Sequence, residues 1–303
     1  MNVLVTGAYG FLGRNVCRLF ADAGANVSGI GHGDWSFSEY SAYGLKSWVN
    51  ADITLDALLK CSTAPDIIIH CAGGSSVHAS VMHPIADFTA TVSSTYAVLE
   101  YLKTSFPKAK LVYTSSAAVY GCANKLPISE SDALHPVSPY GLHKLFSEQL
   151  CRNYAVNHNL DIAIVRLFSI YGPSLKKQLL WDACKRLKSG DSAFFGTGNE
   201  TRDWLHVKDA VHLLALAAKH ADNTCPIVNG GSGMATTNQA LLKQLTLALD
   251  VPLEPRFNQL TRPGDPQHYQ ADIAIAQKWG WNAQINLSEG VKEYAKWFSE
   301  VTG

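Results

Sequence analysis

The sequence predicts an α/β fold in which a doubly wound parallel sheet is joined to a smaller, mostly helical C-terminal lobe. Short apolar runs alternate with segments long enough for a helix through the first half of the chain, and this alternation is typical of a parallel sheet covered on both faces. A glycine-rich turn follows the first apolar run. The alternation then changes after "YGP" (171–173).

The predicted sheet begins close to the N-terminus. Residues 2–7 form the first apolar run, and apolar residues at helical spacing follow it until Gly24, which ends the predicted helix. The stretch from 32 to about 48 is rich in glycine and aromatic residues and is predicted to be irregular. Further buried strands are expected at residues 26–31, 66–70, 110–116 and 161–168.

The second half of the chain predicts a different organisation. A short strand and turn are expected at 193–200, and residues 226–231 form one more apolar strand that returns to the main sheet. The predicted domains are therefore discontinuous: 1–168 with about 205–231, and about 172–204 with 232–303. Helices are expected near residues 176–188, 208–220, 237–249 and 289–300.

Composition excludes several classes of function. The 25 basic and 25 acidic side chains cancel, so no net field draws nucleic acid or an anionic membrane. No apolar run approaches the roughly 20 residues that span a bilayer. The seven cysteines are scattered, without spacing suited to a metal site. We expect a cytoplasmic protein with reduced thiols, no metal, and neither nucleic acid nor membrane as a partner.

The glycine-rich turn is the first functional signal. In "TGAYGFLG", Gly7, Gly10 and Gly13 lie between the first strand and its helix. Glycines there allow close approach of the backbone to a pyrophosphate, which the N-terminus of the helix attracts. The turn predicts a Rossmann-type dinucleotide site, with the intervening residues of the loop also contacting the cofactor: Tyr9, Phe11 and Leu12.

The choice between NAD and NADP depends on the end of the second strand. An acid that accepts the ribose hydroxyls of NAD is usual there, but this chain has Gly31, His32 and Gly33, and its nearest acid is Asp34. Arg14 follows the third glycine of the loop and could accompany His32 at a 2′-phosphate. The sequence therefore slightly favours NADP over NAD.

A tyrosine and a lysine predict the catalytic centre. Of the twelve tyrosines, only Tyr140 has a lysine, Lys144, four residues after it, and residues four apart share one helix face. A nearby positive charge lowers the pKa of a phenol, which would make Tyr140 a general acid/base near neutral pH. Ser116 ends a predicted strand, where doubly wound sheets bind ligands, and could hydrogen-bond the same substrate oxygen.

Six motifs occur in a fixed order along the chain: "TGAYGFLG", "DIIIHCAG", "YTSSAAVYG", "SPYGLHK", "RLFSIYGP" and "TRDWLHVKDA". Together they resemble the extended short-chain dehydrogenase/reductase family of nucleotide-sugar epimerases, dehydratases and reductases. The resemblance implies that Tyr140 is the acid/base and that Lys144 also binds the nicotinamide ribose. It gives Ser116 the serine/threonine role at the substrate, and it implies a homodimer.

The resemblance implies further binding residues. Asp52, with Ile53 beside it, matches the acid at the adenine, and Ala72 and Gly73 match backbone that lines the cofactor. Two arginines fall where the family binds the substrate diphosphate, for which a guanidinium is suited: Arg202 in "TRDW" and Arg262 in "TRPGD".

Three positions depart from the family pattern. His143 replaces the usual serine of "YGxSK", Ser169 replaces an asparagine, and Thr91 replaces the asparagine of the fifth helix. His143 is expected on a helix face or an interface rather than as a second acid. His78 and His83 are expected to be structural or loop residues.

The reaction is left between alternatives. A 4,6-dehydratase needs a further acid and base, and its usual Asp-Glu pair is replaced here by Ala117 and Ala118. A 4-epimerase is favoured, with an NADPH-dependent 4-keto-sugar reductase as the alternative because the second strand lacks its acid. A non-catalytic regulator that senses dinucleotides is the third possibility, although Ser116, Tyr140 and Lys144 are all present.

Overall fold

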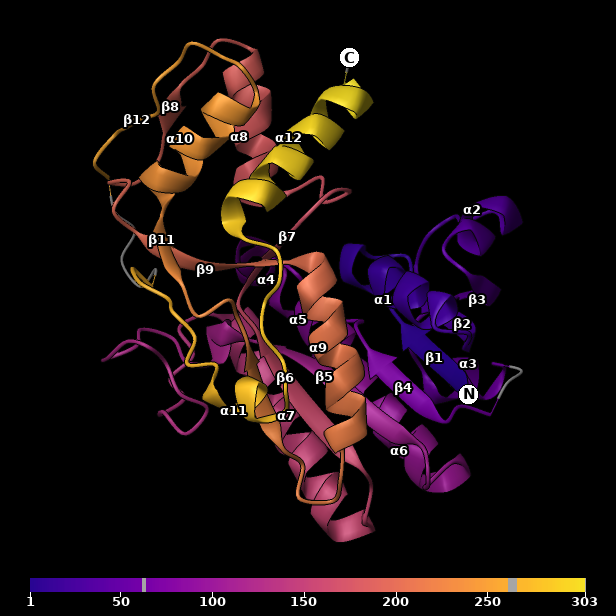
Figure 1. Ribbon diagram of the computed structural model, residues 1–303. Helices are drawn as coiled ribbons and strands as arrows, with labels where there is room; N and C mark the ends of the chain where they lie inside the picture. Colours follow the sequence, from indigo (N-terminus) through magenta and orange to yellow (C-terminus); the bar gives the residue numbers. More distant parts are fainter. Residues whose placement is uncertain (62–63, 261–265, 303) are drawn as a thin grey trace. The chain divides into compact units, whose positions relative to one another are not determined.

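The computed structural model describes residues 1–61, 64–260 and 266–302 (Figure 1). These residues form two compact units. The first consists of Met1–Gly121, Asp132–Leu167 and Val211–Val228, and the second of Cys122–Ser131, Phe168–Ala210 and Asn229–Gly303.

A seven-stranded sheet organises the first unit, with strand order β10-β6-β5-β4-β1-β2-β3. Neighbouring strands from β3 to β6 pair in parallel. The strands are β1 (Asn2–Thr6), β2 (Asn26–Gly31), β3 (Leu45–Asn50), β4 (Ile67–His70), β5 (Lys110–Ser116), β6 (Ile162–Leu167) and β10 (Ile227–Gly230).

Helices follow most of these strands, as Figure 1 shows. The helices are α1 (Phe11–Asp22), α2 (Phe37–Ala42), α3 (Leu55–Leu59), α4 (Val77–Met82), α5 (Pro84–Phe88), α6 (Ser94–Ser105) and α7 (Pro139–His158). A π-helical turn, η1 (Thr89–Ser93), joins α5 to α6, and a 3-10 turn, η2 (Ala117–Val119), follows β5.

The sheet is buried on both faces. Leu111 and Val112 are consecutive in β5 and both fully buried, although consecutive strand residues point to opposite faces. On one face, Leu111 joins an apolar cluster with Leu58 of α3, Leu102 of α6 and Ala155 of α7. The doubly wound parallel sheet that the alternation predicted is thus confirmed.

The region from 32 to 48 was predicted to be irregular, and this prediction was wrong. It contains the helix α2 and the edge strand β3, whose register with β2 shifts between Val27 and Ser28. The sequence of β3, "LKSWVN", has no continuous apolar run, because only Leu45 is fully buried in this edge strand. The strand at 110–116 is therefore the fifth strand of the chain and not the fourth.

The second unit contains helices and two small sheets. The sheets have strand orders β11-β9-β7 and β12-β8. The strands are β7 (Ser169–Tyr171), β8 (Ala193–Phe194), β9 (Thr201–His206), β11 (Ala235–Thr237) and β12 (Arg256–Phe257), and the helices are α8 (Gln178–Lys188), α10 (Asn238–Ala248), α11 (Ala274–Lys278) and α12 (Leu287–Thr302). The helix α9 (Val207–His220) passes from the second unit into the first.

Residues 122–131 belong to the second unit, whereas the sequence analysis included them in the first domain. Backbone hydrogen bonds explain this. The Ile128 N–H donates to the Gln270 carbonyl over 2.7 Å, and the Asp272 N–H donates to the Ile128 carbonyl over 2.8 Å. The segment is held by residues more than a hundred positions later in the chain.

Within the described residues, no helix combines the length and apolarity that crossing a membrane would need.

Candidate active site

The glycine loop has the geometry that close backbone approach requires. Gly7 has φ +68°, and a Cβ there would lie 2.8 Å from the Ala72 nitrogen; a Cβ on Gly13 would lie 2.2 Å from the Gly7 oxygen. Gly10 is the N-cap of α1 and makes no side-chain capping bond. The first-turn N–H groups of α1 therefore have no competing side-chain cap, which suits an anion such as a pyrophosphate.

Arg14 is held against the loop. Its Nε and Nη2 donate to the Tyr9 carbonyl over 3.2 and 2.6 Å. The guanidinium carbon lies 5.2 Å from the ring centroids of Tyr9 and Tyr43 and 5.7 Å from that of Trp35. Arg14 therefore lies among three aromatic rings, an arrangement that the sequence pattern did not predict.

Two predicted cofactor residues contact each other at the end of β2. His32 Nε2 lies 2.7 Å from Asp52 Oδ1, and both side chains are more than 70% exposed, at 75% and 79%. Ile53 follows Asp52 and is partly buried against the apolar cluster of the first unit. The structure thus pairs His32 with an acid that lies twenty residues later, and not with the nearest acid, Asp34.

The loop after β4 brings Ala72 and Gly73 to the catalytic lysine. Ala72 N–H donates to Thr6 Oγ1 over 3.3 Å. A Cβ on Gly73, whose φ is +142°, would lie 3.3 Å from Lys144 Nζ. The predicted cofactor loop therefore lies directly beside the predicted catalytic lysine.

The N-terminus of α7 positions Tyr140 and Lys144. Ser138 caps the helix by accepting from the Gly141 N–H over 3.1 Å, and Pro139 occupies the first turn, where its missing N–H costs nothing. Lys144 Nζ donates to the Thr114 carbonyl over 2.8 Å and lies 6.0 Å from the centroid of the Tyr140 ring. The pair is thus ordered by α7 and by the end of β5.

Ser116 meets Tyr140 at the carboxyl end of β5. It lies close enough to the Tyr140 side chain that hydrogen bonding by Ser116 lowers the pKa of the phenol, and its hydroxyl accepts from the Ala118 N–H over 3.2 Å. The three predicted catalytic residues are therefore brought together, and Ser116 serves at the same time as the cap of η2.

Burial dominates the acid/base properties of this group. It lowers the pKa of Lys144 to about 8, an effect partly offset by the negative groups around it. Burial also raises the pKa of Tyr140, the hydrogen bond from Ser116 lowers it in part, and the charge of Asp87 raises it further. The nearby cation was expected to lower the pKa of Tyr140, but removal of the phenolate from water has the larger effect and raises it.

Two of the three departures from the family pattern, His143 and Thr91, lie here. His143 Nδ1 lies 2.6 Å from Asp87 Oδ2, and both side chains are buried. Thr91, in the π-helical turn, accepts from the Gly74 N–H over 2.8 Å. His78 and His83 of the neighbouring α4 segment are exposed.

A buried ion pair between Arg166 and Glu148 lies near the carboxyl ends of β5 and β6. Arg166 Nη2 donates to Glu148 Oε2 over 2.7 Å, and Ser115 donates to the same carboxylate over 2.5 Å. The guanidinium of Arg166 also donates to the Tyr120 hydroxyl. Because Glu148 of α7 bonds both Arg166 of β6 and Ser115 of β5, the ion pair connects these three elements next to Ser116.

In the second unit, Arg202 lies on β9. Its Nη1 donates to the Thr201 carbonyl over 2.8 Å and to the Gln267 carbonyl over 3.2 Å, and it stacks 5.7 Å from the Tyr269 ring centroid. The neighbouring Asp203 accepts from backbone N–H groups of Ser232, Gly233 and Ala271. Arg262 and Asp265 lie outside the described residues, and Ser169 begins β7.

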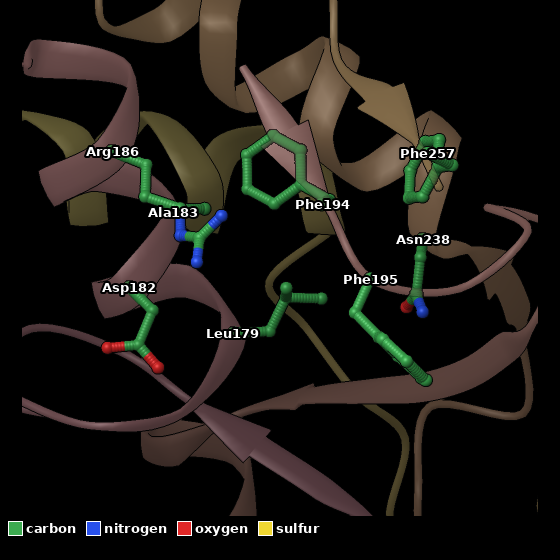
Figure 2. Close-up of a pocket in the computed structure, with 8 residues that line it drawn as sticks. All are labelled: Leu179, Asp182, Ala183, Arg186, Phe194, Phe195, Asn238 and Phe257. Atoms are coloured by element: carbon green, nitrogen blue, oxygen red, sulfur yellow. The ribbon is translucent and has the colours of Figure 1, made fainter. Parts of the chain in front are cut away.

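A pocket of about 180 Å³ lies in the second unit (Figure 2). Figure 2 shows Asp182 and Arg186 on one side and Asn238 and Phe257 on the other. In the part of the chain that the structure describes, Asn238 Oδ1 is buried and has no hydrogen-bond partner. The remaining lining residues are Leu179, Ala183, Phe194 and Phe195.

Comparison with known proteins identifies the family. The model of the NAD dependent epimerase/dehydratase family matches residues 3–231. The chain belongs to the NAD dependent epimerase/dehydratase family. Among its relatives, a UDP-glucose 4-epimerase from Mycolicibacterium smegmatis is 32% identical, with 98% of each chain covered.

Solved structures of family members share the whole fold. A UDP-glucose 4-epimerase from Thermotoga maritima, solved with UDP-glucose, has a TM-score of 0.91 at 26% identity and full coverage of both chains. A UDP-glucuronic acid 4-epimerase from Bacillus cereus, solved with UDP-glucuronic acid and NAD, has a TM-score of 0.87 at 26% identity. It covers 99% of this chain and 100% of its own.

Two features of this family member escaped the sequence analysis. Asp87 belongs to no motif, although the departure at Thr91 lies four residues after it and the departure at His143 contacts it. The pocket of Figure 2 is built from short apolar pieces of α8, β8, α10 and β12, and none of these pieces has a distinctive spacing. Among the described residues, no group of three or more His, Cys, Asp or Glu side chains is placed to bind a metal ion.

Proposed function

We propose that this family member is an NAD-dependent nucleotide-sugar 4-epimerase in which Tyr140 is the acid/base. The meeting of Tyr140, Lys144 and Ser116 beside the Gly73 loop carries the proposal, because it places a proton-transferring phenol next to the predicted cofactor backbone. The 4-epimerases among its relatives and structural neighbours support the same reaction class.

The residues of the first unit would perform the proton chemistry. Tyr140 would take the proton of the C4 hydroxyl, while Ser116 holds that oxygen and Lys144, protonated below its pKa of about 8, favours the phenolate. The glycine loop and Lys144 would hold NAD, which would supply reversible hydride transfer at C4, so that the configuration there can be inverted. Tyr140 would then return the proton to the oxygen, so that the protein ends in its starting state.

The geometry at the adenosine end supports NAD, although the sequence slightly favoured NADP. Arg14 is bonded to the Tyr9 carbonyl and stacked between rings, so binding a 2′-phosphate would require it to leave these contacts. His32 already has an acid within 2.7 Å. The Asp52 carboxylate would repel a 2′-phosphate at that position.

The second unit would hold the nucleoside diphosphate. An aromatic pocket with one unpartnered acceptor, Asn238 Oδ1, suits a planar base that offers an N–H group. Arg202 lies over the Tyr269 ring, and we propose it, together with Arg262, for the diphosphate. The first unit would then be the dinucleotide-binding domain and the second the nucleotide-sugar-binding domain.

A homodimer remains part of the proposal. Exposed apolar side chains occur on α5, α6 and α7 of the first unit: Ile85, Phe88, Tyr96, Leu142 and Phe146. Burial of such a face between two copies would remove apolar area from water. Light scattering on the purified protein would give the mass of the particle in solution.

The test is to denature the purified protein, identify any released dinucleotide by mass spectrometry, and follow UDP-sugars by NMR, with Tyr140→Phe as the control. Stoichiometric NAD, together with exchange of C4 epimers by the wild type alone, is the expected result. A protein that arrives empty, binds NADPH far more tightly than NADH and consumes it with a 4-keto sugar would instead be a reductase. That outcome would overturn the proposal.

A further inference from the structure

The buried contact between Asp87 and His143 lies near the proposed acid/base, because His143 follows Tyr140 by three residues in α7 and the Asp87 charge acts on Tyr140. Asp87 is in α5 and His143 in the first turns of α7, and Nδ1 to Oδ2 is 2.6 Å. The carboxylate is 6% exposed and the imidazole 9%. Since an ionised carboxylate only accepts hydrogen bonds, Nδ1 of His143 is the donor.

The second carboxylate oxygen of Asp87 faces the loop that lines the proposed cofactor site. A Cβ on Gly74 would lie 1.8 Å from Asp87 Oδ1, so this position must be glycine for the carboxylate to fit. The Gly74 N–H itself is taken by Thr91. Asp87 is thereby fixed between α7 and the loop whose Gly73 lies beside Lys144.

The Asp87 carboxylate affects the acid/base residues because its partner, His143, shares a helix face with them. Tyr140, His143 and Lys144 are spaced i, i+3 and i+4 along α7, which places them on one face of the helix. The Asp87 charge acts on two of them, since it raises the pKa of Tyr140 in addition to burial and opposes the burial that lowers the pKa of Lys144. Among the described residues, it is the one carboxylate whose charge acts on both Tyr140 and Lys144.

Resting on the proposed function, we propose that Asp87 and His143 are positioning residues for the acid/base step. The His143 ring holds the carboxylate against the Gly74 loop, and the carboxylate makes Tyr140 a stronger base toward the sugar hydroxyl. Its negative charge also keeps the Lys144 ammonium protonated. The pair would thus set the pH range of the reaction from a position that touches neither sugar nor cofactor.

Other titratable groups face this site, and the experiment must separate them from Asp87. Tyr113 of β5 has Lys144 Nζ 5.2 Å from its ring centroid, and α4 contributes the exposed His78 and its C-cap His83. The further groups whose charges act on Lys144, or on which Lys144 acts, are His70, Cys71, Glu148 and Cys151.

A merely structural tie between α5 and α7 would depend on shape and hydrogen bonding, not on charge. Asp87→Asn distinguishes a structural role from an electrostatic one, because the amide oxygen can still accept from His143 while the charge is removed. His143→Asn is the complement, since its amide N–H can replace Nδ1 as donor and leaves the carboxylate charged. Asp22→Asn, at the exposed end of α1, is the matched control for loss of one carboxylate from the same unit.

The experiment is the pH dependence of turnover at saturating UDP-sugar for the wild type and these variants, with thermal melting as a check on folding. For Asp87→Asn, the acidic limb is expected to move to lower pH, so that the variant keeps about threefold more of its plateau rate on that limb. His143→Asn is expected to lower the plateau without moving the limb. Asp22→Asn should match the wild type.

Folded Asp87→Asn and His143→Asn proteins that lose plateau rate equally, with both limbs unmoved, would show a structural tie and overturn the inference. Wild-type protein that turns over no UDP-sugar would instead count against the proposed function. The inference would then be decided by absorbance titration of Tyr140, taken as the difference from Tyr140→Phe, in protein loaded with NAD. An unchanged tyrosine titration in Asp87→Asn would overturn it there as well.

Discussion

Two histidine–aspartate pairs of nearly equal length occur in the first unit, and they differ in their surroundings. His32 and Asp52 are 2.7 Å apart and largely exposed, whereas His143 and Asp87 are 2.6 Å apart and buried. The first pair lies at the end of β2, beside the proposed adenosine site. The second lies behind Tyr140.

The difference shows that the distance between two charged groups does not determine their effect. Water and salt screen the exposed pair, so that its contribution to folding and to its neighbours is small. The buried carboxylate is screened much less, and its charge acts on both Tyr140 and Lys144.

The largest effect is expected at the proposed acid/base beside the buried pair. Tyr140→Phe removes the hydroxyl and should lower kcat by about 10²- to 10⁴-fold, while His32→Ala should change kcat by less than about twofold because it lies at the exposed end. Progress curves with a UDP-sugar measure both rates. Equal losses in the two variants would contradict the assignment of Tyr140, provided that both retain dinucleotide.

Removing the aspartate of each pair should lower the free energy of unfolding by different amounts. Asp87→Ala leaves a buried imidazole without its partner and should cost about 3 kcal/mol, whereas Asp52→Ala should cost less than about 1 kcal/mol. Urea unfolding at neutral pH measures the free energy of each variant. Similar midpoints for the two variants would mean that burial does not distinguish the pairs.

Lys144, which lies beside the buried pair, is expected to lower the free energy of unfolding. Burial lowers the pKa of Lys144 from 10.5 to about 8, so the charged form destabilises the folded state. This cost is complete below pH 8 and disappears as the pH rises toward 10.5, because the unfolded chain binds the extra proton in that window. Lys144→Met should therefore add about 1–2 kcal/mol at pH 7 while removing turnover.

Comparing the unfolding free energies of Lys144→Met and wild type between pH 7 and 10 would check this sign. The gain should shrink as the pH rises. A gain that grows with pH, or a variant less stable than wild type throughout, would show that the hydrogen bond to the Thr114 carbonyl outweighs the burial of charge.

The smallest effect concerns salt. A double-mutant cycle on His32 and Asp52 should give a coupling of about 0.5 kcal/mol or less that vanishes in 1 M NaCl, where the Debye length is about 3 Å. The same cycle on His143 and Asp87 should give a larger coupling that changes little with salt. Equal salt dependence in the two cycles would remove the distinction between them.

Local patterns in the sequence determined much of this protein. The glycine loop, the buried strands and the spacing of Tyr140 and Lys144 each depend on residues within one turn or one strand, where the period of the element sets which side chains share a face. The ordered motifs indicated the family, and the family model matches residues 3–231. The fold class followed from the same local signals.

Only the tertiary structure decided which distant groups meet. Asp87 and His143 are 56 residues apart, and His32 and Asp52 are 20 apart. The edge strand β3 lacks an apolar run because one of its faces is only partly covered. The contact of Arg14 with the surrounding aromatic rings could not be predicted from residue spacing. Burial, which separates the two histidine–aspartate pairs, is a property of packing between elements, and no single segment of the sequence contains it.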